Sequence, residues 1–113
     1  VILGTAAQTA GIATVVGGSG KDTLDATLFT RALVLDGGQG DNSLFGGAGN
    51  DSLTGGAGID TFAVTSGTDT ITDLGLGGAD ILTVASVSTA NATIAGSWTA
   101  TSLSVNSGTA NSK

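Results

Sequence analysis

The 113-residue sequence contains no cysteine, histidine, tyrosine, glutamate, proline or methionine. Without cysteine, neither disulfides nor thiol chemistry can operate in this chain. Without histidine, cysteine, tyrosine or glutamate, no obvious base is present to activate a serine or threonine nucleophile. Two aspartates could in principle serve a hydrolase, but here they recur with a nine-residue period among glycines, which favours metal ligation. We therefore expect that this chain is not an enzyme.

Basic residues are also scarce. Lys21, Arg31 and Lys113 stand against nine aspartates, which gives a net charge of −6. Such an acidic chain is a poor partner for nucleic acid or for anionic membrane surfaces, and no apolar run approaches the ~20 residues that span a bilayer. We expect neither nucleic-acid binding nor direct membrane insertion. The start at Val1 has no initiator Met and no charged signal-peptide segment, which favours an internal piece of a larger chain.

Glycine is abundant, with 20 residues, and its placement is periodic. Three consecutive nonapeptides occupy residues 37–45, 46–54 and 55–63. Each has glycine at its positions 1, 2 and 4. Position 6 holds an acid or its amide, namely Asn42, Asp51 and Asp60. Position 8 holds an apolar residue, namely Leu44, Leu53 and Phe62.

This pattern has a direct physical reading. The glycines allow six residues to form a tight turn, and the last three residues alternate polar, apolar, polar, as in a short strand with one side chain inward. A unit this small must stack on copies of itself to bury that side chain. Two nonapeptides make a coil of eighteen residues, so acids of successive coils lie above one another and repel. Ca²⁺, which accepts about six to eight oxygen ligands in loose geometry, would remove the repulsion.

The three repeats resemble the repeat-in-toxin (RTX) nonapeptide family of secreted calcium-binding proteins. The resemblance implies an all-β fold, a right-handed parallel β-roll (β-solenoid) with calcium between successive turns on each side. It also implies a secreted or cell-surface location after export by a type I secretion system, as part of a larger secreted bacterial protein.

The register extends to both sides of the three central repeats. Residues 8–16 fit it without an acid and are interpreted as an opening coil, 17–25 are a full repeat, and 26–36 are a half-coil with a two-residue bulge. Residues 64–72 and 75–83 are weaker repeats. The predicted inward column is Val15, Leu24, Leu35, Leu44, Leu53, Phe62, Ile71 and Leu82.

The chain divides by composition into a roll, residues 1–83, and a Ser/Thr/Ala-rich β cap or start of a following module, residues 84–113. Within the cap, residues 95–99 and 102–106 are predicted to form short strands, Trp98 to be a cap or core residue, and residues 106–113 to be frayed.

Stacking the turns in order assigns the metal ligands. Turns that begin at Gly17, Gly37, Gly55 and Gly75 fall on one side, and those that begin at Leu28, Gly46 and Val64 on the other. The predicted pairs are Asp22 with Asn42, Asn42 with Asp60, Asp60 with Asp80, and Asp51 with Asp69, which gives about three to five ions. Carbonyls of the glycine turns complete the sites, with Gly17, Gly20, Gly37, Gly40, Gly46, Gly49, Gly55 and Gly58 as candidates.

Three side chains have special expectations. Asp73 is expected to help close the last site. Asn42 keeps an oxygen but lacks the charge, so its two sites should bind calcium more weakly. Arg31 lies in a turn without an acid and is interpreted as an exposed residue.

The leading functional hypothesis is a calcium-binding β-roll that folds on Ca²⁺ binding after secretion and serves a structural surface protein such as an S-layer, filament or adhesin. The alternative is a C-terminal accessory domain of a secreted protease, lipase or epimerase. Ice binding through threonine rows and a solenoid that needs no metal are minor alternatives. Exposed strand edges at the ends would permit self-association.

Overall fold

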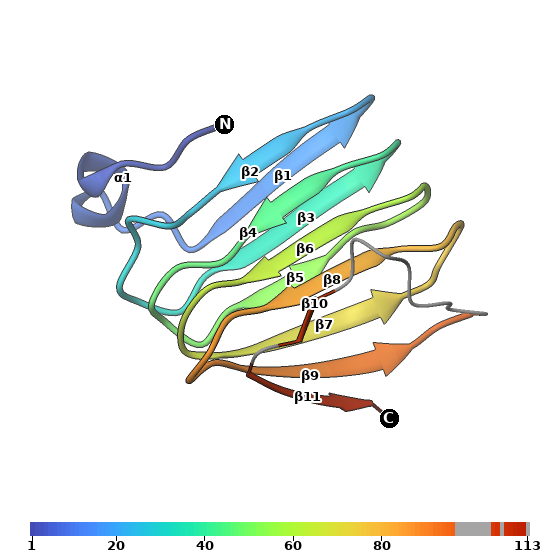
Figure 1. The fold of residues 1–113 in the computed structure, drawn as a ribbon. Coiled ribbons are helices and arrows are strands. Elements are labelled where there is room, and N and C mark those ends of the chain that lie inside the picture. The colour runs from blue at the N-terminus through green and yellow to red at the C-terminus, as the bar shows by residue number, and fades with distance from the viewer. Residues whose placement is uncertain (97–104, 107, 113) are drawn as a thin grey trace.

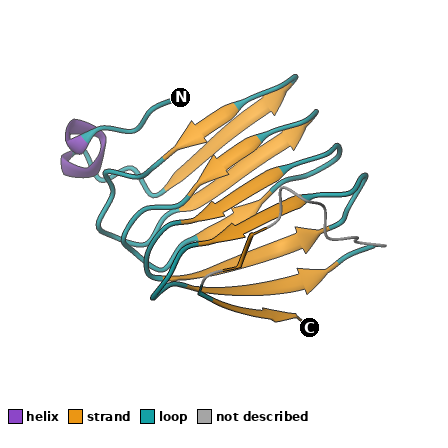
Figure 2. Ribbon diagram, viewed as in Figure 1, coloured by secondary structure: helices purple, strands orange, loops and turns teal. Residues whose placement is uncertain are grey.

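The computed structural model describes residues 1–96, 105, 106 and 108–112. The chain winds into a flattened solenoid of 38 × 32 × 21 Å, with two parallel sheets facing each other across one core (Figure 1). Apart from one short helix, the regular structure of these residues is strand, and turns join the two sheets at both sides (Figure 2). The predicted all-β, parallel β-solenoid is confirmed.

The two sheets take alternate strands of the chain. The six-stranded sheet contains, in spatial order, β1 (Thr14–Ser19), β3 (Val34–Gln39), β5 (Ser52–Thr54), β7 (Thr68–Leu74), β9 (Thr89–Ile94) and β11 (Thr109–Ser112). The five-stranded sheet contains β2 (Thr23–Asp25), β4 (Ser43–Phe45), β6 (Thr61–Val64), β8 (Ile81–Val84) and β10 (Val105–Asn106). Every neighbouring pair is parallel, because each coil passes each sheet in the same direction.

The register follows the predicted inward column. In one sheet Leu35 pairs with Leu53, which pairs with Ile71. In the other, the aligned residues are Leu24, Leu44, Phe62 and Leu82. All of these are buried, and only Val15, in the first coil, is half-buried. In β2 to β5 the core is therefore one apolar side chain deep per strand, whereas β6 to β9 each bury two, and Phe29 and Leu33 join the same core from a turn.

Close stacking of the turns explains the glycines. Gly56 has φ +95°, a left-handed conformation that other residues rarely adopt, and a β-carbon on it would lie 1.8 Å from the Gly38 carbonyl oxygen. The backbone of one turn thus rests directly on the next. No side chain fits between them.

The N-terminal coil differs from the prediction. Thr5–Thr9 form a short helix, α1, instead of a glycine turn, because this Ala-rich segment has no glycine at turn positions 1 and 2 and favours helix. The Gln8 side-chain oxygen accepts a hydrogen bond from the Thr30 backbone N–H at 2.6 Å, and the Arg31 guanidinium donates to the Gln8 carbonyl. Arg31 is exposed, as expected, but it fastens the helix to the first coil.

The C-terminal part continues the same stacking. β9 pairs with β7, and β11 pairs with β9, where Asn111 donates to Asn91 at 3.0 Å. The prediction that residues 106–113 are frayed was therefore wrong for Thr109–Ser112, which form β11 and extend the sheet. The predicted strand at 95–99 and Trp98 fall largely outside the described residues, whereas β10 lies within the predicted 102–106 segment. No helix in the described residues has the length and apolar character to cross a membrane.

Truncating the central core should destabilise the roll. Leu53 is fully buried, so Leu53→Ala removes packing and leaves a cavity, which costs about 2–5 kcal/mol in the free energy of unfolding. The matched control is Leu28→Ala, because Leu28 is 56% exposed and its truncation should change that free energy by less than about 0.5 kcal/mol. Urea unfolding in saturating calcium measures both. Equal effects of the two substitutions would contradict the one-layer core.

Candidate calcium sites

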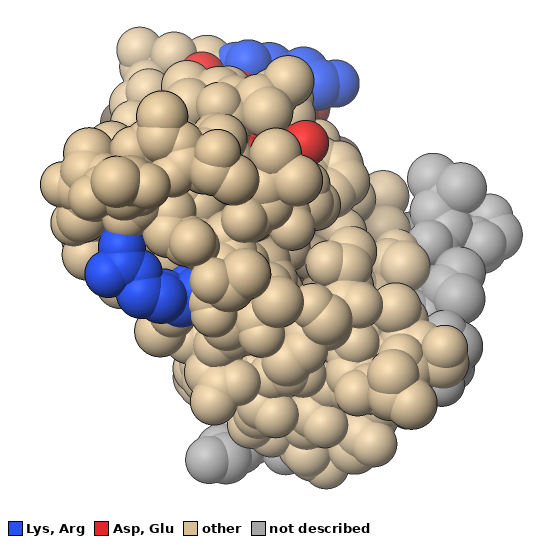
Figure 3. All heavy atoms as spheres, turned by 90° about the vertical axis from the view of Figure 1, so that its left-hand side faces the viewer, with Lys and Arg blue, Asp and Glu red and all other residues tan. Residues whose placement is uncertain are grey.

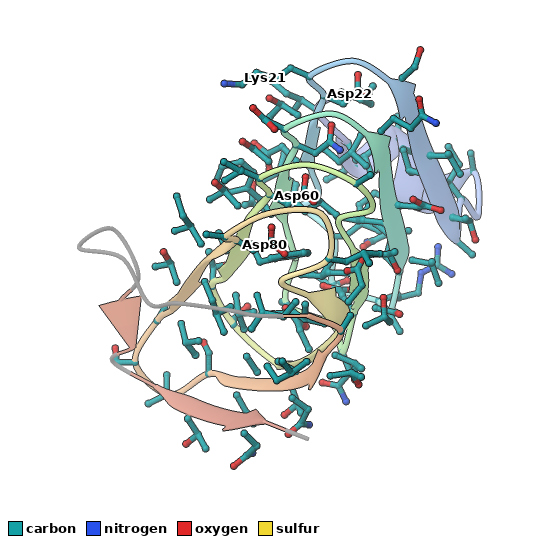
Figure 4. The ribbon with its side chains drawn as sticks, turned by 90° about the vertical axis from the view of Figure 1, so that its right-hand side faces the viewer. Lys21, Asp22, Asp60 and Asp80 are labelled. Carbon is teal, nitrogen blue, oxygen red and sulfur yellow. The ribbon has the colours of Figure 1, made fainter. Side chains whose placement is uncertain are left out.

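A ladder of backbone-to-side-chain hydrogen bonds runs along the turns of one side. The Asp22 N–H donates to Asn42 Oδ1 at 2.9 Å, the Asn42 N–H to Asp60 Oδ1 at 2.8 Å, and the Asp60 N–H to Asp80 Oδ1 at 2.9 Å. Each position-6 side chain therefore holds the turn of the preceding coil. Asp22, Asp60 and Asp80 follow one another beneath these turns (Figure 4).

The opposite side repeats this ladder with fewer acids. The Leu33 N–H donates to Asp51 Oδ1 and the Asp51 N–H to Asp69 Oδ1, both at 2.9 Å. The structure thus brings together all four predicted pairs, Asp22 with Asn42, Asn42 with Asp60, Asp60 with Asp80, and Asp51 with Asp69. Leu33 shows that a turn without an acid can still donate its N–H to the acid of the next coil.

The Oδ2 atoms of the position-6 aspartates do not take part in the ladders. Asp51 Oδ2 and Asp80 Oδ2 accept from the N–H groups of Gly47 and Gly75, both at 2.7 Å. Three others are buried and have no hydrogen-bond partner: Asp22 Oδ2, Asp60 Oδ2 and Asp69 Oδ2. A buried charged oxygen without a partner is costly, so each of the three marks a place for a proton or a cation.

The surroundings of these oxygens supply further oxygen atoms. A β-carbon on Gly46 would lie 2.5 Å from Asp69 Oδ2 and 3.0 Å from Asp51 Oδ2, so the two carboxylates converge on this glycine. At Gly17 the corresponding neighbours are the Gly37 carbonyl oxygen, at 2.7 Å, and Asp22 Oδ2, at 2.8 Å. Carboxylate and carbonyl oxygens are the donor set of a hard divalent cation. The residues present therefore fit calcium.

The remaining candidate glycines shape these turns. Gly20, Gly40 and Gly58 have φ between +103° and +138°, and β-carbons on Gly40 and Gly58 would each lie 2.4 Å from a carbonyl oxygen of the preceding turn. Gly49 stacks in the same way on Arg31. Across the described residues no three aspartates gather as one metal-binding cluster, so backbone carbonyls must provide much of each coordination shell.

Burial governs the protonation of these acids. Desolvation raises the pKa of Asp69 to about 7 and that of Asp60 to about 6, and the neighbouring carboxylates Asp51 and Asp80, respectively, add to the rise. Desolvation also raises the pKa of Asp51 and Asp80, although backbone N–H donors partly oppose it. Asp51, Asp60, Asp69 and Asp80 are all buried, and the face that carries α1 shows only small acidic areas (Figure 3).

Two sets of hydrogen bonds in the turns were not predicted from the sequence. Asp73 accepts from the N–H groups of Gly55 at 2.9 Å and Gly56 at 2.7 Å, so it anchors the start of a glycine turn. An outer ladder also exists at position 5, where Asp41 Oδ1 accepts from the Ile59 N–H and Asn50 Oδ1 from the Thr68 N–H. The sequence signal was an oxygen-bearing residue before each of two position-6 residues.

A family profile described as the RTX calcium-binding nonapeptide repeat (4 copies) matches residues 9–27 and 34–62. These segments include Asp22, Asn42, Asp51 and Asp60 of the two ladders, whereas Leu33, Asp69 and Asp80 lie outside them. These two segments are RTX calcium-binding repeats. Neither the curated proteins nor the solved structures contain a match to it.

RTX repeats bind calcium and act as structural rather than catalytic modules. In this RTX roll, calcium would be held by the three unpartnered carboxylate oxygens together with turn carbonyls. When bound, the ion supplies positive charge between oxygen atoms that otherwise repel. The chain's own residues fix the oxygens at the spacing of the coils.

The raised pKa values predict how the metal-free RTX roll responds to pH. Because the pKa of Asp60 and Asp69 is higher in the folded than in the unfolded chain, their stabilising protonation is complete below about pH 4 and is lost as the pH rises through about 6 to 7. In chelator, the far-UV β signal should therefore be stronger at pH 5 than at pH 8. In saturating calcium the order should reverse, because calcium competes with these protons.

Asp69→Asn is the control for this pH effect, since it removes the group with the pKa of about 7. The metal-free variant should lose the highest step of the pH response and keep the step from Asp60. A metal-free β signal that does not change between pH 5 and pH 8 would refute the assignment.

Removing Asp73 should loosen the turn at Gly55. Asp73→Ala leaves two backbone N–H groups without their acceptor, which costs on the order of 2 kcal/mol in the free energy of unfolding. Asp36→Ala removes the same charge from the half-buried outer face of β3 and should cost less than about 0.5 kcal/mol. Denaturant unfolding in saturating calcium compares the two. An Asp73→Ala variant as stable as Asp36→Ala would mean that this anchor is dispensable.

Proposed function

We propose that this RTX roll is a calcium-dependent folding switch of a secreted bacterial protein. The observation that carries the proposal is the set of three buried carboxylate oxygens, on Asp22, Asp60 and Asp69, that have no hydrogen-bond partner. At neutral pH and without calcium their charge opposes folding. Binding free energy of calcium then becomes folding free energy, so the chain folds where calcium is abundant.

The thin core supports the same proposal. Strands β2 to β5 each bury a single apolar side chain and β6 to β9 only two each, while glycine-rich turns lose more conformational entropy on folding than other segments. The apolar contacts of such a roll offset little of that entropy, and the buried charges lower the free energy of unfolding further. An unfolded chain inside the cell, where calcium is scarce, suits export through a type I secretion system, and folding would follow in the extracellular medium.

We propose a structural role in an extracellular or cell-surface protein, such as an S-layer, filament or adhesin. The uncharged coils after Asp80 favour this assignment, because they extend the sheets without metal ligands: Ala90 occupies the position that Asp69 has in the coil before. We assign residues 1–83 to the calcium-dependent roll and 84–113 to its cap. The accessory domain of a secreted enzyme is the alternative.

Self-association through strand edges belongs to this structural role. β1 is the outermost strand of its sheet in the described structure, whereas the first strand of the other sheet, β2, is covered by a bridge from Ile2 to Asp25. A threonine-based ice-binding face has less support. The outward column of the six-stranded sheet is mixed, namely Thr14, Val34, Ser52, Thr70 and Asn91.

The test is a calcium titration followed by far-UV circular dichroism at pH 7.5. We expect a cooperative change from coil to β signal with calcium and none with magnesium, which demands a tighter octahedral site. Asp69→Ala should move the midpoint to higher calcium, whereas Asp25→Ala, which alters only an exposed turn around Thr27, should leave it in place. A complete β signal in chelator would overturn the folding switch.

A further inference from the structure

Asn42 interrupts the series of position-6 acids on one side of the roll. It is 1% exposed and lies between Asp22 in the coil before and Asp60 in the coil after. A buried amide at this place has both a donor and an acceptor to satisfy. Its hydrogen bonds therefore show what the position requires.

Both halves of the amide are satisfied. Asn42 Oδ1 accepts from the Asp22 N–H, as the acids of the ladder do for their own neighbours. Asn42 Nδ2 donates to the carbonyl oxygens of Gly40, at 2.9 Å, and Gly55, at 3.3 Å. If the amide were turned by 180°, its oxygen would face the two carbonyl oxygens and no hydrogen bond could form there. The atom that faces the two carbonyls is therefore the nitrogen.

The same place one coil earlier contains an aspartate. A β-carbon on Gly37 would lie 2.7 Å from Asn42 Nδ2 and 2.7 Å from the Gly55 carbonyl oxygen. On Gly17 it would lie 2.8 Å from Asp22 Oδ2 and 2.7 Å from the Gly37 carbonyl oxygen. Each place between two successive turns of one side is called a level here, and the two levels have the same geometry. At the level of Asn42, an N–H donor points at the carbonyl oxygens. At the level of Asp22, a carboxylate oxygen without a partner takes the place of that donor.

We propose that the Asn42 amide replaces a calcium ion at the level between the turns that begin at Gly37 and Gly55. The inference rests on the calcium binding proposed above for the other levels. Asn42 Nδ2 supplies to the Gly40 and Gly55 carbonyls the positive partner that a cation supplies elsewhere. This goes beyond the expectation from sequence, in which Asn42 only weakens two sites: one level takes no ion, while the level at Asp22 keeps its own.

Two reciprocal substitutions test the exchange of amide and ion. Asn42→Asp should add one calcium ion per chain, because a carboxylate oxygen then faces the two carbonyls. Asp22→Asn should remove one ion, because its amide can donate to the Gly37 carbonyl in the equivalent geometry. Native mass spectrometry in saturating calcium counts the ions, and equilibrium dialysis with radioactive calcium checks the count.

Asn50→Asp is the matched control. It makes the same change of amide to carboxylate at an exposed position beside Asp51, where the side-chain oxygen accepts from the Thr68 N–H and can still do so. The ion count should stay at the wild-type value. A gain of one ion in Asn50→Asp as well would mean that added negative charge alone explains the result, and would overturn the proposal.

The calcium dependence of folding gives a second readout. Asn42→Asp should fold at higher calcium and with a steeper transition, since one more ion is taken up on folding, and Asp22→Asn should show the opposite changes. Equal ion counts for the wild type and Asn42→Asp, both binding calcium, would overturn the proposal and leave the folding switch intact.

A wild type that binds no calcium would overturn the folding switch. In that case, one ion bound by Asn42→Asp would still support the exchange, and none would overturn both.

Discussion

A buried carboxylate oxygen without a hydrogen-bond donor is the constraint on which this roll depends. In Asp60 and Asp69, Oδ1 is fixed by an N–H of the preceding coil, as with Asp69 and the Asp51 N–H. That bond leaves the other oxygen pointing into the turn. The glycine backbones stack without intervening side chains, so the oxygen has no room to turn toward water. Only a proton, a cation or a donor in its place resolves the conflict.

The same stacking that creates this conflict also provides the fold's regularity. Coils repeat after 18 residues where the turns are short, as between β3 and β5, and after 20 to 22 where residues are inserted, as between β1 and β3 and between β7 and β9. The inward leucines remain in register, because the insertions lie in the turns or near the end of β7. Backbone hydrogen bonds between coils thus fix the spacing, and the apolar column packs within it. A core this thin leaves the stability of the roll sensitive to the state of a few acids.

The periodic part of the structure could be predicted from the sequence, and the parts that break the period could not. Leu24 and Leu53 were placed in the core because a strand buries every second side chain, and Asp51 was paired with Asp69 because stacking repeats after two nonapeptides. Helix α1 was missed because residues 8–16 contain Gly11 and Val15 in register, although the segment before them lacks turn glycines. The hydrogen bonds of Asp73 were not predicted, because its partners, the N–H groups of a turn 17 and 18 residues earlier, depend on how the inserted residues bend β7.

Asn42 shows why a motif does not by itself give the number of metal ions. Aspartate and asparagine have the same shape, and both can accept the ladder bond through Oδ1. They differ in one atom, which is either an acceptor that needs a cation or a donor that satisfies the carbonyls directly. An amide at the centre of one side therefore separates the Asp22 level from the Asp60 level, so ions on that side do not share a ligand. The opposite side, where Asp51 and Asp69 converge on Gly46, keeps two carboxylates together and has the stronger demand for charge. An exchange of aspartate for asparagine at position 6 of a turn thus changes the number of calcium ions on which folding depends, while the backbone of the turn stays the same.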